Sequence, residues 1–170
     1  MAELRINVSG LSAGTHEYQF EAGAESLGLA DRFLGPVTVD ARLEKAGSQI
    51  FLKVSLKATG AFVCDRCLDE FQRTLDGSYS IVYDTEPRRQ APTPDQRMEI
   101  QVIPADKNYL DLDEDVRQYA LLAVPQKMLC RENCAGLCPH CGKNRNRETC
   151  TCSDQSLDSR WEGLKDLLTN

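Results

Sequence analysis

The feature that most constrains this chain is the spacing of its eight cysteines, which fall into four close pairs. No cysteine precedes Cys64, and six of them lie between Cys130 and Cys152. Two cysteines a few residues apart in a turn provide half of a tetrahedral metal site. In a reducing compartment, such pairs are more typical of metal binding or redox chemistry than of disulfide bonds. The cysteines therefore predict that metal or redox chemistry organises part of the fold.

The C-terminal cysteines have the spacing of a compact zinc site. Residues 138–142 have the sequence Cys-Pro-His-Cys-Gly, in which the proline can set a bend and Gly142 can adopt a positive φ. Residues 150–152 place two further cysteines on the same side of an extended segment, because alternate strand residues face one way. The loop that closes such a site is short and costs little entropy. We assign one zinc ion to Cys138, Cys141, Cys150 and Cys152.

The remaining thiols can form a second zinc site of the same kind, with ligands Cys64, Cys67, Cys130 and Cys134. A metal bound by them would link segments far apart in sequence and would strongly stabilise the folded state. We therefore expect two zinc ions per chain. An iron–sulfur cluster could use the same ligands. The Cys64–Cys67 pair could also act alone as a redox dithiol, although the βαβ context typical of that chemistry is absent.

Hydrophobic alternation predicts strands through much of the chain, and a turn at residues 46–48 joins two of them in a long hairpin. The expected strands cover residues 4–8, 15–20, 37–43, 50–56, 79–83 and 98–103. Hydrophobic residues then recur at helical spacing from Val116 to Ala123, and Pro125 ends the run. A second short helix is expected over residues 157–168. The predicted fold is α+β, a mainly antiparallel β-sheet or barrel-like domain with one helix and a zinc-knuckle C-terminal module.

We expect two structural units. Residues 1–125 form the β-rich domain that ends in the helix, and residues 126–170 form the cysteine-rich zinc module with the terminal helix. The polar, proline-containing stretch over residues 84–97 is expected to be a loop insertion. No stretch approaches the roughly 20 apolar residues that cross a bilayer, and the N-terminus lacks the pattern of a secretory signal. The sequence therefore predicts a soluble cytoplasmic protein with no membrane partner.

Charge is unevenly distributed along the chain. The 20 basic and 26 acidic residues give a net charge of −6, which excludes a uniformly cationic nucleic-acid-binding protein. Around the cysteines the balance reverses, because residues 125–149 contain five cations and two acids. Such a patch is typical of an RNA or protein contact, although cations could equally offset thiolate charge. The candidate binding residues are Lys127, Arg131, Lys143, Arg145 and Arg147.

The sequence contains no recognisable catalytic motif. It has no phosphate-binding glycine loop, no Ser/His/Asp arrangement and no nucleophile outside the candidate metal ligands. We therefore expect no enzymatic activity and no small-molecule substrate. Asp111, Asp113 and Asp115 could bind magnesium as in a hydrolase. Because a helix N-terminus favours the same carboxylates without a metal, we prefer that interpretation.

In these residues the chain resembles the YceD family, the large ribosomal RNA subunit accumulation proteins. Three blocks carry the resemblance, in family-like order and spacing. They are CDRCL at residues 64–68, LDLDEDVR leading to LLAVP over residues 110–125, and CRENCAGLCPHCG at residues 130–142, followed by Asn144, Asn146 and CTC at residues 150–152. One departure is Arg145, at a position where family members often carry an apolar residue.

The resemblance implies a bacterial, cytoplasmic factor needed for normal accumulation of large-subunit ribosomal RNA, with no known catalytic activity. The implied partner is large-subunit precursor rRNA or a ribosomal protein, which we expect to contact the basic surface of the zinc module. Some relatives lack most of the C-terminal cysteines, which implies that the terminal zinc site is dispensable to the shared function. The alternative function is a zinc-containing thiol redox switch or chaperone, whose cysteines release the metal on oxidation.

Overall fold

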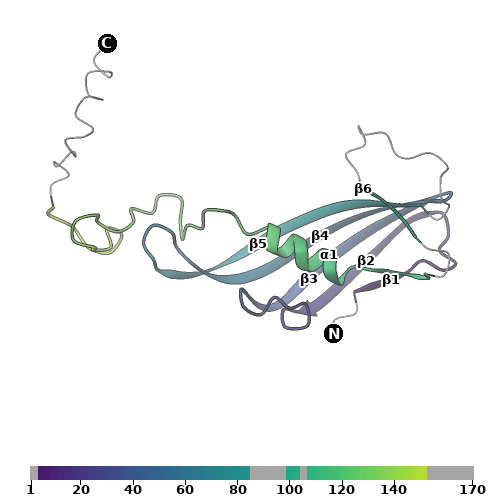
Figure 1. Ribbon diagram of the computed structural model, residues 1–170, viewed down its shortest axis with the longest axis horizontal. Coiled ribbons are helices and arrows are strands. Elements are labelled where there is room, and N and C mark those ends of the chain that lie inside the picture. The colour runs from purple at the N-terminus through teal and green to yellow at the C-terminus, as the bar shows by residue number, and fades with distance from the viewer. Residues whose placement is uncertain (1–3, 85–98, 104–106, 153–170) are drawn as a thin grey trace, which may run out of the picture.

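In the part of the chain that the structure describes, the strands form one five-stranded sheet and one two-stranded sheet. Figure 1 shows their arrangement. The computed structural model describes residues 4–84, 99–103 and 107–152. The larger sheet has the order β2-β3-β4-β5-β6, and these strands span Gly14–Gly23, Phe33–Ala46, Gln49–Val63, Glu70–Asp84 and Glu99–Val102. The smaller sheet pairs β1 (Arg5–Asn7) with β7 (Tyr109–Asp111), and the helix α1 spans Asp113–Leu122.

Hydrophobic alternation builds the central hairpin. β3 and β4 pair antiparallel across a tight turn, and their alternate apolar side chains are buried on one face of the sheet. These side chains are Val37, Val39, Ala41 and Leu43 on β3, and Ile50, Leu52, Val54 and Leu56 on β4. Burial of each valine, leucine or isoleucine side chain contributes roughly 1.5–3 kcal/mol to the stability of the fold. The pairs β2–β3 and β4–β5 are also antiparallel, whereas β6 joins β5 in parallel. The prediction of a mainly antiparallel sheet domain with a helix is confirmed.

Helix α1 packs on the buried face of the sheet. Val116 and Ala120 are its buried residues, and the ring of Tyr119 stacks on Tyr79 of β5 with centroids 4.5 Å apart. Beneath the helix, a Cβ at Gly77 would lie 3.2 Å from the carbonyl oxygen of Tyr119. The missing side chain at Gly77 therefore lets the helix approach the sheet closely. The opposite face of β2, β3 and β4 is exposed.

Several strands differ from their expected bounds. β5 begins at Glu70 rather than at residue 79, and β2 continues to Gly23. The early part of β5 is rich in polar residues and carries little alternation, so its pairing with β4 determines its conformation. β7 was not predicted, because a three-residue strand is too short to produce a periodic pattern.

Some expectations fall where the structure describes no residues. The second helix over residues 157–168 lies there, as does the expected loop over residues 84–97 apart from Asp84, which ends β5. The division of the chain at residue 125 stays a prediction. Among the described residues, no helix has the length and apolar character needed to span a membrane.

Candidate metal centres

β4 and β5 extend beyond the helix as a long hairpin, and the chain that follows α1 runs towards the hairpin turn (Figure 1). The backbone N–H of Cys64 donates to the carbonyl of Asp69 at 2.9 Å, which closes the turn. Asp65 then holds the returning chain. Its N–H donates to the carbonyl of Met128 at 2.9 Å, and its carboxylate accepts the N–H of Met128 at 2.6 Å. These contacts place the first cysteine pair beside the segment that carries the other six cysteines.

The first group of cysteines, which we call the hairpin cluster, comprises Cys64, Cys67, Cys130 and Cys134. The four sulfurs lie within 4.8 Å of one another. The Sγ atoms of Cys64 and Cys134 are 3.8 Å apart, and those of Cys67 and Cys130 are 3.7 Å apart. Tetrahedral zinc with bonds of about 2.3 Å requires sulfur–sulfur distances of about 3.8 Å. Four mostly buried thiols at this spacing fit one zinc ion.

The second group, which we call the terminal cluster, comprises Cys138, Cys141, Cys150 and Cys152. Its four sulfurs also lie within 4.8 Å of one another, and Cys150 Sγ is 3.3 Å from Cys138 Sγ and 3.5 Å from Cys141 Sγ. Cys138 is buried, whereas Cys141 and Cys152 are exposed. Gly142 has a φ of 73°, in the region that its place after the CPHC turn requires. These are the same two groups of four cysteines that the spacing in the sequence predicts.

The surroundings of the hairpin cluster favour negative charge on one sulfur and disfavour it on another. Burial opposes ionisation of Cys64, but backbone N–H groups, chiefly that of Cys130, outweigh it and lower the pKa of this thiol to about 6. The backbone of Asp69 favours the Cys67 thiolate, but burial and the neighbouring sulfurs prevail and raise its pKa to about 12. Four thiolates this close together therefore require a cation among them, which a divalent metal ion supplies.

The terminal cluster follows the same electrostatic pattern. The backbone N–H groups of Cys141 and His140 point towards the sulfur of Cys138 and lower its pKa to about 6. The neighbouring sulfurs of Cys150 and Cys141 raise the pKa of Cys152 to about 12. The CPHC turn thus stabilises the first thiolate through its backbone, and the last thiolate needs a cation.

Two asparagines connect the terminal cluster with the hairpin cluster. Asn146, in the loop between Cys141 and Cys150, donates from Nδ2 to the Sγ of Cys134 at 3.3 Å. Asn144 donates from Nδ2 to Asp69 Oδ2 at 2.9 Å, and the same carboxylate oxygen lies 3.5 Å from Cys67 Sγ. The two asparagine side chains also bond each other at 2.9 Å.

The loop that the terminal cluster closes therefore supplies a hydrogen bond to Cys134 of the hairpin cluster, and it holds the Asp69 carboxylate that contacts Cys67. The sequence alone predicts no role for either asparagine, although the Asn-x-Asn spacing within the last cysteine block is a visible signal.

Arg66, between the first two cysteines, fixes the path of the chain that carries Cys134. Its guanidinium donates to the carbonyl of Cys134 at 2.9 Å, and its own carbonyl accepts the N–H of Leu137 at 2.9 Å. Gly136 has a φ of 71°, and a Cβ there would lie 3.0 Å from the carbonyl oxygen of Arg66. Only glycine combines this conformation with so close an approach.

The predicted binding cations differ in how far intramolecular contacts engage them. Arg147 forms a 3.0 Å ion pair with Asp69, and Lys143 lies 3.5 Å from Glu148. Arg145 is exposed. Sequence could not reveal the pairing of Arg147, because Asp69 lies on the distant hairpin.

The other two predicted cations, Lys127 and Arg131, line a hollow of about 320 Å³ between β5 and the chain after α1. Arg131 is also held by Asn146, whose Oδ1 accepts from its guanidinium at 2.7 Å. A further cation, Arg73, was not singled out from the sequence and lies in the same wall. The residues that line this hollow include Phe71, Arg73, Lys127, Leu129, Arg131 and Glu132.

The acidic residues at the start of the helix and just before it have structural partners. Asp113 Oδ1 accepts the backbone N–H of Leu4 at 2.9 Å. Asp111 Oδ1 accepts the N–H of Asp113 at 3.2 Å, and its Oδ2 lies 3.3 Å from Nε of Arg5. These contacts tie the short β1–β7 sheet to the start of the helix and account for both carboxylates without a metal.

Comparison with known protein families gives a match over more than half of the chain. The family model described as large ribosomal RNA subunit accumulation protein YceD matches residues 52–168, which is more than half of the chain. The match covers both groups of cysteines. No curated protein and no solved structure matches the chain.

Proposed function

The chain belongs to the YceD family, and we propose that it acts by binding, without catalysing a reaction. Membership implies a role in accumulation of the large ribosomal subunit RNA. One observation supports a binding mechanism. All eight cysteines and the cations around them lie together at the turn of the β4–β5 hairpin. Zinc bound by four thiolates has no open coordination position, so such centres support a structure rather than activate a substrate.

We assign one zinc ion to each cluster. The donor set supports this assignment, because four thiols at tetrahedral spacing are the preferred ligands of structural zinc. Sulfurs within 4.8 Å of one another suit a single ion better than the several irons and sulfides of an iron–sulfur cluster. When bound, zinc would cross-link its four thiolates. Elemental analysis should find two zinc ions per chain, whereas one zinc, or iron with visible absorbance, would contradict the assignment.

We propose large-subunit precursor rRNA as the direct partner, with the hollow beside the hairpin cluster as its main contact. Arg73, Lys127 and Arg131 face this hollow against one carboxylate, that of Glu132, so its charge complements phosphate. Phe71 and Leu129 add an apolar wall, which suits the bases of single-stranded RNA. Arg145, Lys143 and Arg147 extend the cationic surface over the terminal cluster. Because the latter two are ion-paired, we expect them to contribute less.

Charge removal tests this surface. The double variant Arg73→Gln/Lys127→Gln should weaken binding of the tagged protein to pre-ribosomal particles and reduce the salt dependence of affinity by about two units of slope. The matched control is Lys53→Gln/Lys57→Gln, which removes the same charge from the exposed face of β4. Equal effects of the two double variants would contradict a local RNA site. Particle binding that survives nuclease treatment would point to a ribosomal protein as the partner.

One observation favours the redox alternative at the terminal cluster only. Cys141 and Cys152 are exposed, so an oxidant could reach two of the four sulfurs of that cluster. Thiol titration of the zinc-loaded protein distinguishes the functions. Unreactive thiols with retained zinc support the binding function, and rapid oxidation with zinc release supports the switch.

A further inference from the structure

The far edge of the large sheet is open. Strand β2 pairs along its ten residues with β3, and within residues 4–84, 99–103 and 107–152 no other strand pairs with it. An edge strand carries unpaired N–H and C=O groups that can accept another strand. This edge belongs neither to the metal centres nor to the cationic hollow.

The exposed face along this edge is acidic. Glu17 and Glu21 project from β2 on the solvent side. On the neighbouring strand, the exposed charged residues are Glu44, Arg42 and Asp40, which pair in register with Thr15, Glu17 and Gln19 respectively. The exposed face beside the open edge therefore carries four carboxylates and one cation. Charged side chains on an edge disfavour pairing with like-charged strands and favour a strand of opposite charge.

The other face of the same edge is apolar. Tyr18 and Phe20 alternate with the glutamates, and both are half-buried on the core side of the sheet. Their rings are stacked, with centroids 6.2 Å apart and planes at 11°. An added strand would cover what remains exposed of this aromatic pair. The edge thus presents carboxylates on one side and aromatic rings on the other, with the two-residue period of a strand.

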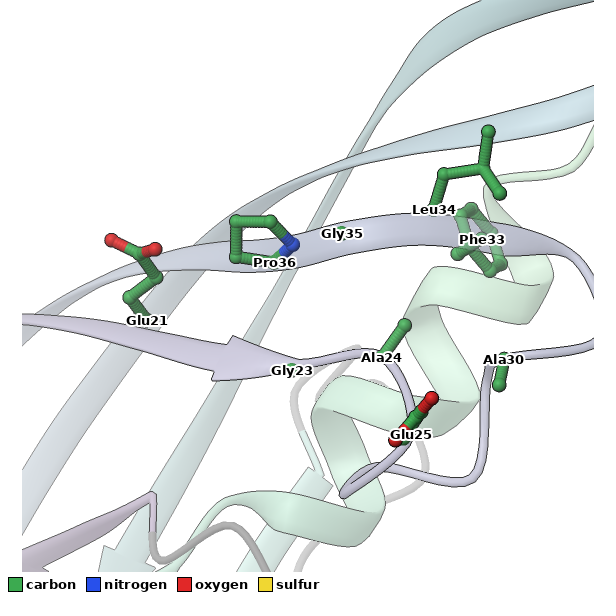
Figure 2. Close-up of a pocket in the computed structure, with 9 residues that line it drawn as sticks. All are labelled: Glu21, Gly23, Ala24, Glu25, Ala30, Phe33, Leu34, Gly35 and Pro36. Carbon is green, nitrogen blue, oxygen red and sulfur yellow. The ribbon is translucent and has the colours of Figure 1, made fainter.

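A hollow of about 630 Å³ lies where β2 ends and β3 begins. Figure 2 shows the residues that line it. Its apolar wall includes Phe33, Leu34 and Pro36, and Leu34 is 44% exposed. Glu21 and Glu25 also line it. The pairing of β3 with β4 shifts register between Leu34 and Thr38, next to this wall. A long side chain with an apolar stem and a positive tip matches this lining.

We propose that the β2 edge binds an extended basic segment of a partner protein, which adds to the sheet as a sixth strand. Alternate lysine or arginine side chains of the segment face Glu17 and Glu21, and the intervening apolar side chains cover Tyr18 and Phe20. A terminal lysine or arginine enters the hollow beside Glu25. Main-chain hydrogen bonds supply affinity and the alternating side chains supply specificity.

The same charges argue against other occupants. In an edge-to-edge pair of two copies, the acidic rows of both β2 strands would lie close together and repel each other. RNA phosphate would meet the same repulsion. The chain therefore carries two surfaces of opposite preference, with cations at the hairpin end and carboxylates at the β2 edge.

Peptide binding to the full-length protein tests the proposal. A fluorescent ten-residue peptide that alternates lysine with valine matches β2 in length and should bind in fluorescence anisotropy. A glutamate–valine peptide should not bind. A lysine–valine peptide N-methylated at alternate residues should lose binding, because it keeps its charge but loses the hydrogen bonds along one edge. Hydrogen exchange should slow at the amides of residues 14–23 when the unmodified peptide is added.

Charge reversal provides the matched comparison. Glu17→Lys/Glu21→Lys should weaken peptide binding about tenfold or more. The control variant Glu70→Lys/Asp76→Lys changes the net charge equally on exposed positions of β5 and should leave binding unchanged. Equal loss in both variants, binding of the N-methylated peptide, or no binding of the unmodified peptide would overturn the proposal. A wild-type chain that is already dimeric with its β2 amides protected would overturn it as well.

Discussion

The contact between Asn146 and Cys134 gives the sharpest prediction about the metal centres. Asn146→Ala removes the Nδ2 donor that lies 3.3 Å from the Cys134 sulfur. It also removes the Oδ1 acceptor of the Ala135 N–H, at 2.8 Å, and of the Arg131 guanidinium, at 2.7 Å. Outer-shell contacts to metal ligands are worth about 10- to 100-fold in metal affinity, or about 1.4–2.8 kcal/mol. We expect a loss of this size at the hairpin cluster.

A competition titration with a chromophoric zinc chelator measures this loss. Cobalt substitution provides a second readout, because thiolate-to-cobalt absorption reports directly on the ligands. Asn146→Asp keeps the Oδ1 acceptor but replaces the amide donor with a carboxylate that repels the thiolate, so it should lose at least as much affinity as Asn146→Ala. The control is Asn7→Ala, on β1, whose side chain accepts only the N–H of Ser9 among the hydrogen bonds described for it.

A zinc affinity of Asn146→Ala within about a factor of two of the wild-type value would contradict this prediction, because outer-shell contacts usually contribute more than that. The loop between Cys141 and Cys150 would then contribute nothing to metal affinity at the hairpin cluster. A loss as large in Asn7→Ala would show instead that the assay reports general stability.

Three further predictions concern stability and metal retention. Cys64→Ser should lower the thermal unfolding temperature far more than Cys152→Ser, because Cys64 is a buried member of the cluster that joins distant segments; calorimetry that finds equal temperatures would contradict the assigned roles. Protons compete with zinc for thiolates, and the lowered pKa of Cys64 keeps that thiolate available down to about pH 6. Zinc should therefore be retained at neutral pH and released on acidification. A dye assay that found zinc release on raising the pH would contradict this pH dependence. Gly77→Val should cost about 1–3 kcal/mol in urea unfolding, because the new side chain meets Leu56 and the backbone of Tyr119; an unchanged midpoint would mean that the helix does not rest on β5 at this position.

The sequence predicts those features of the fold that leave a local pattern. Alternation from Val37 to Leu43 and from Ile50 to Leu56 identified the central hairpin, because one buried face imposes a two-residue period. The early part of β5 has no such pattern, since its polar residues are held in the strand by pairing with β4. Its extension was therefore missed, although it forms one side of the hairpin that carries Cys64.

The candidate metal centres likewise have features that a local sequence pattern predicts and features that depend on the tertiary fold. Cysteine spacing indicates how the thiols group, because each turn brings its own pair together. The partners of Asn146 and Arg147 depend on the tertiary path that brings the terminal loop back to the hairpin, so no local pattern predicts them. The five cations were likewise counted as one patch, whereas the structure engages them to different extents.

The hairpin cluster also has a consequence for biosynthesis. Its ligands are separated by 63 residues from Cys67 to Cys130 and by 70 from Cys64 to Cys134. A ribosome that adds about 5–20 residues per second therefore exposes the first thiol pair roughly 3–13 s before the second pair is made. During that interval the growing chain holds only half of a metal site on an otherwise complete hairpin. A metal ion can be bound by all four thiols only after the second pair has been made, and an oxidant that joined Cys64 to Cys67 in the interval would prevent it.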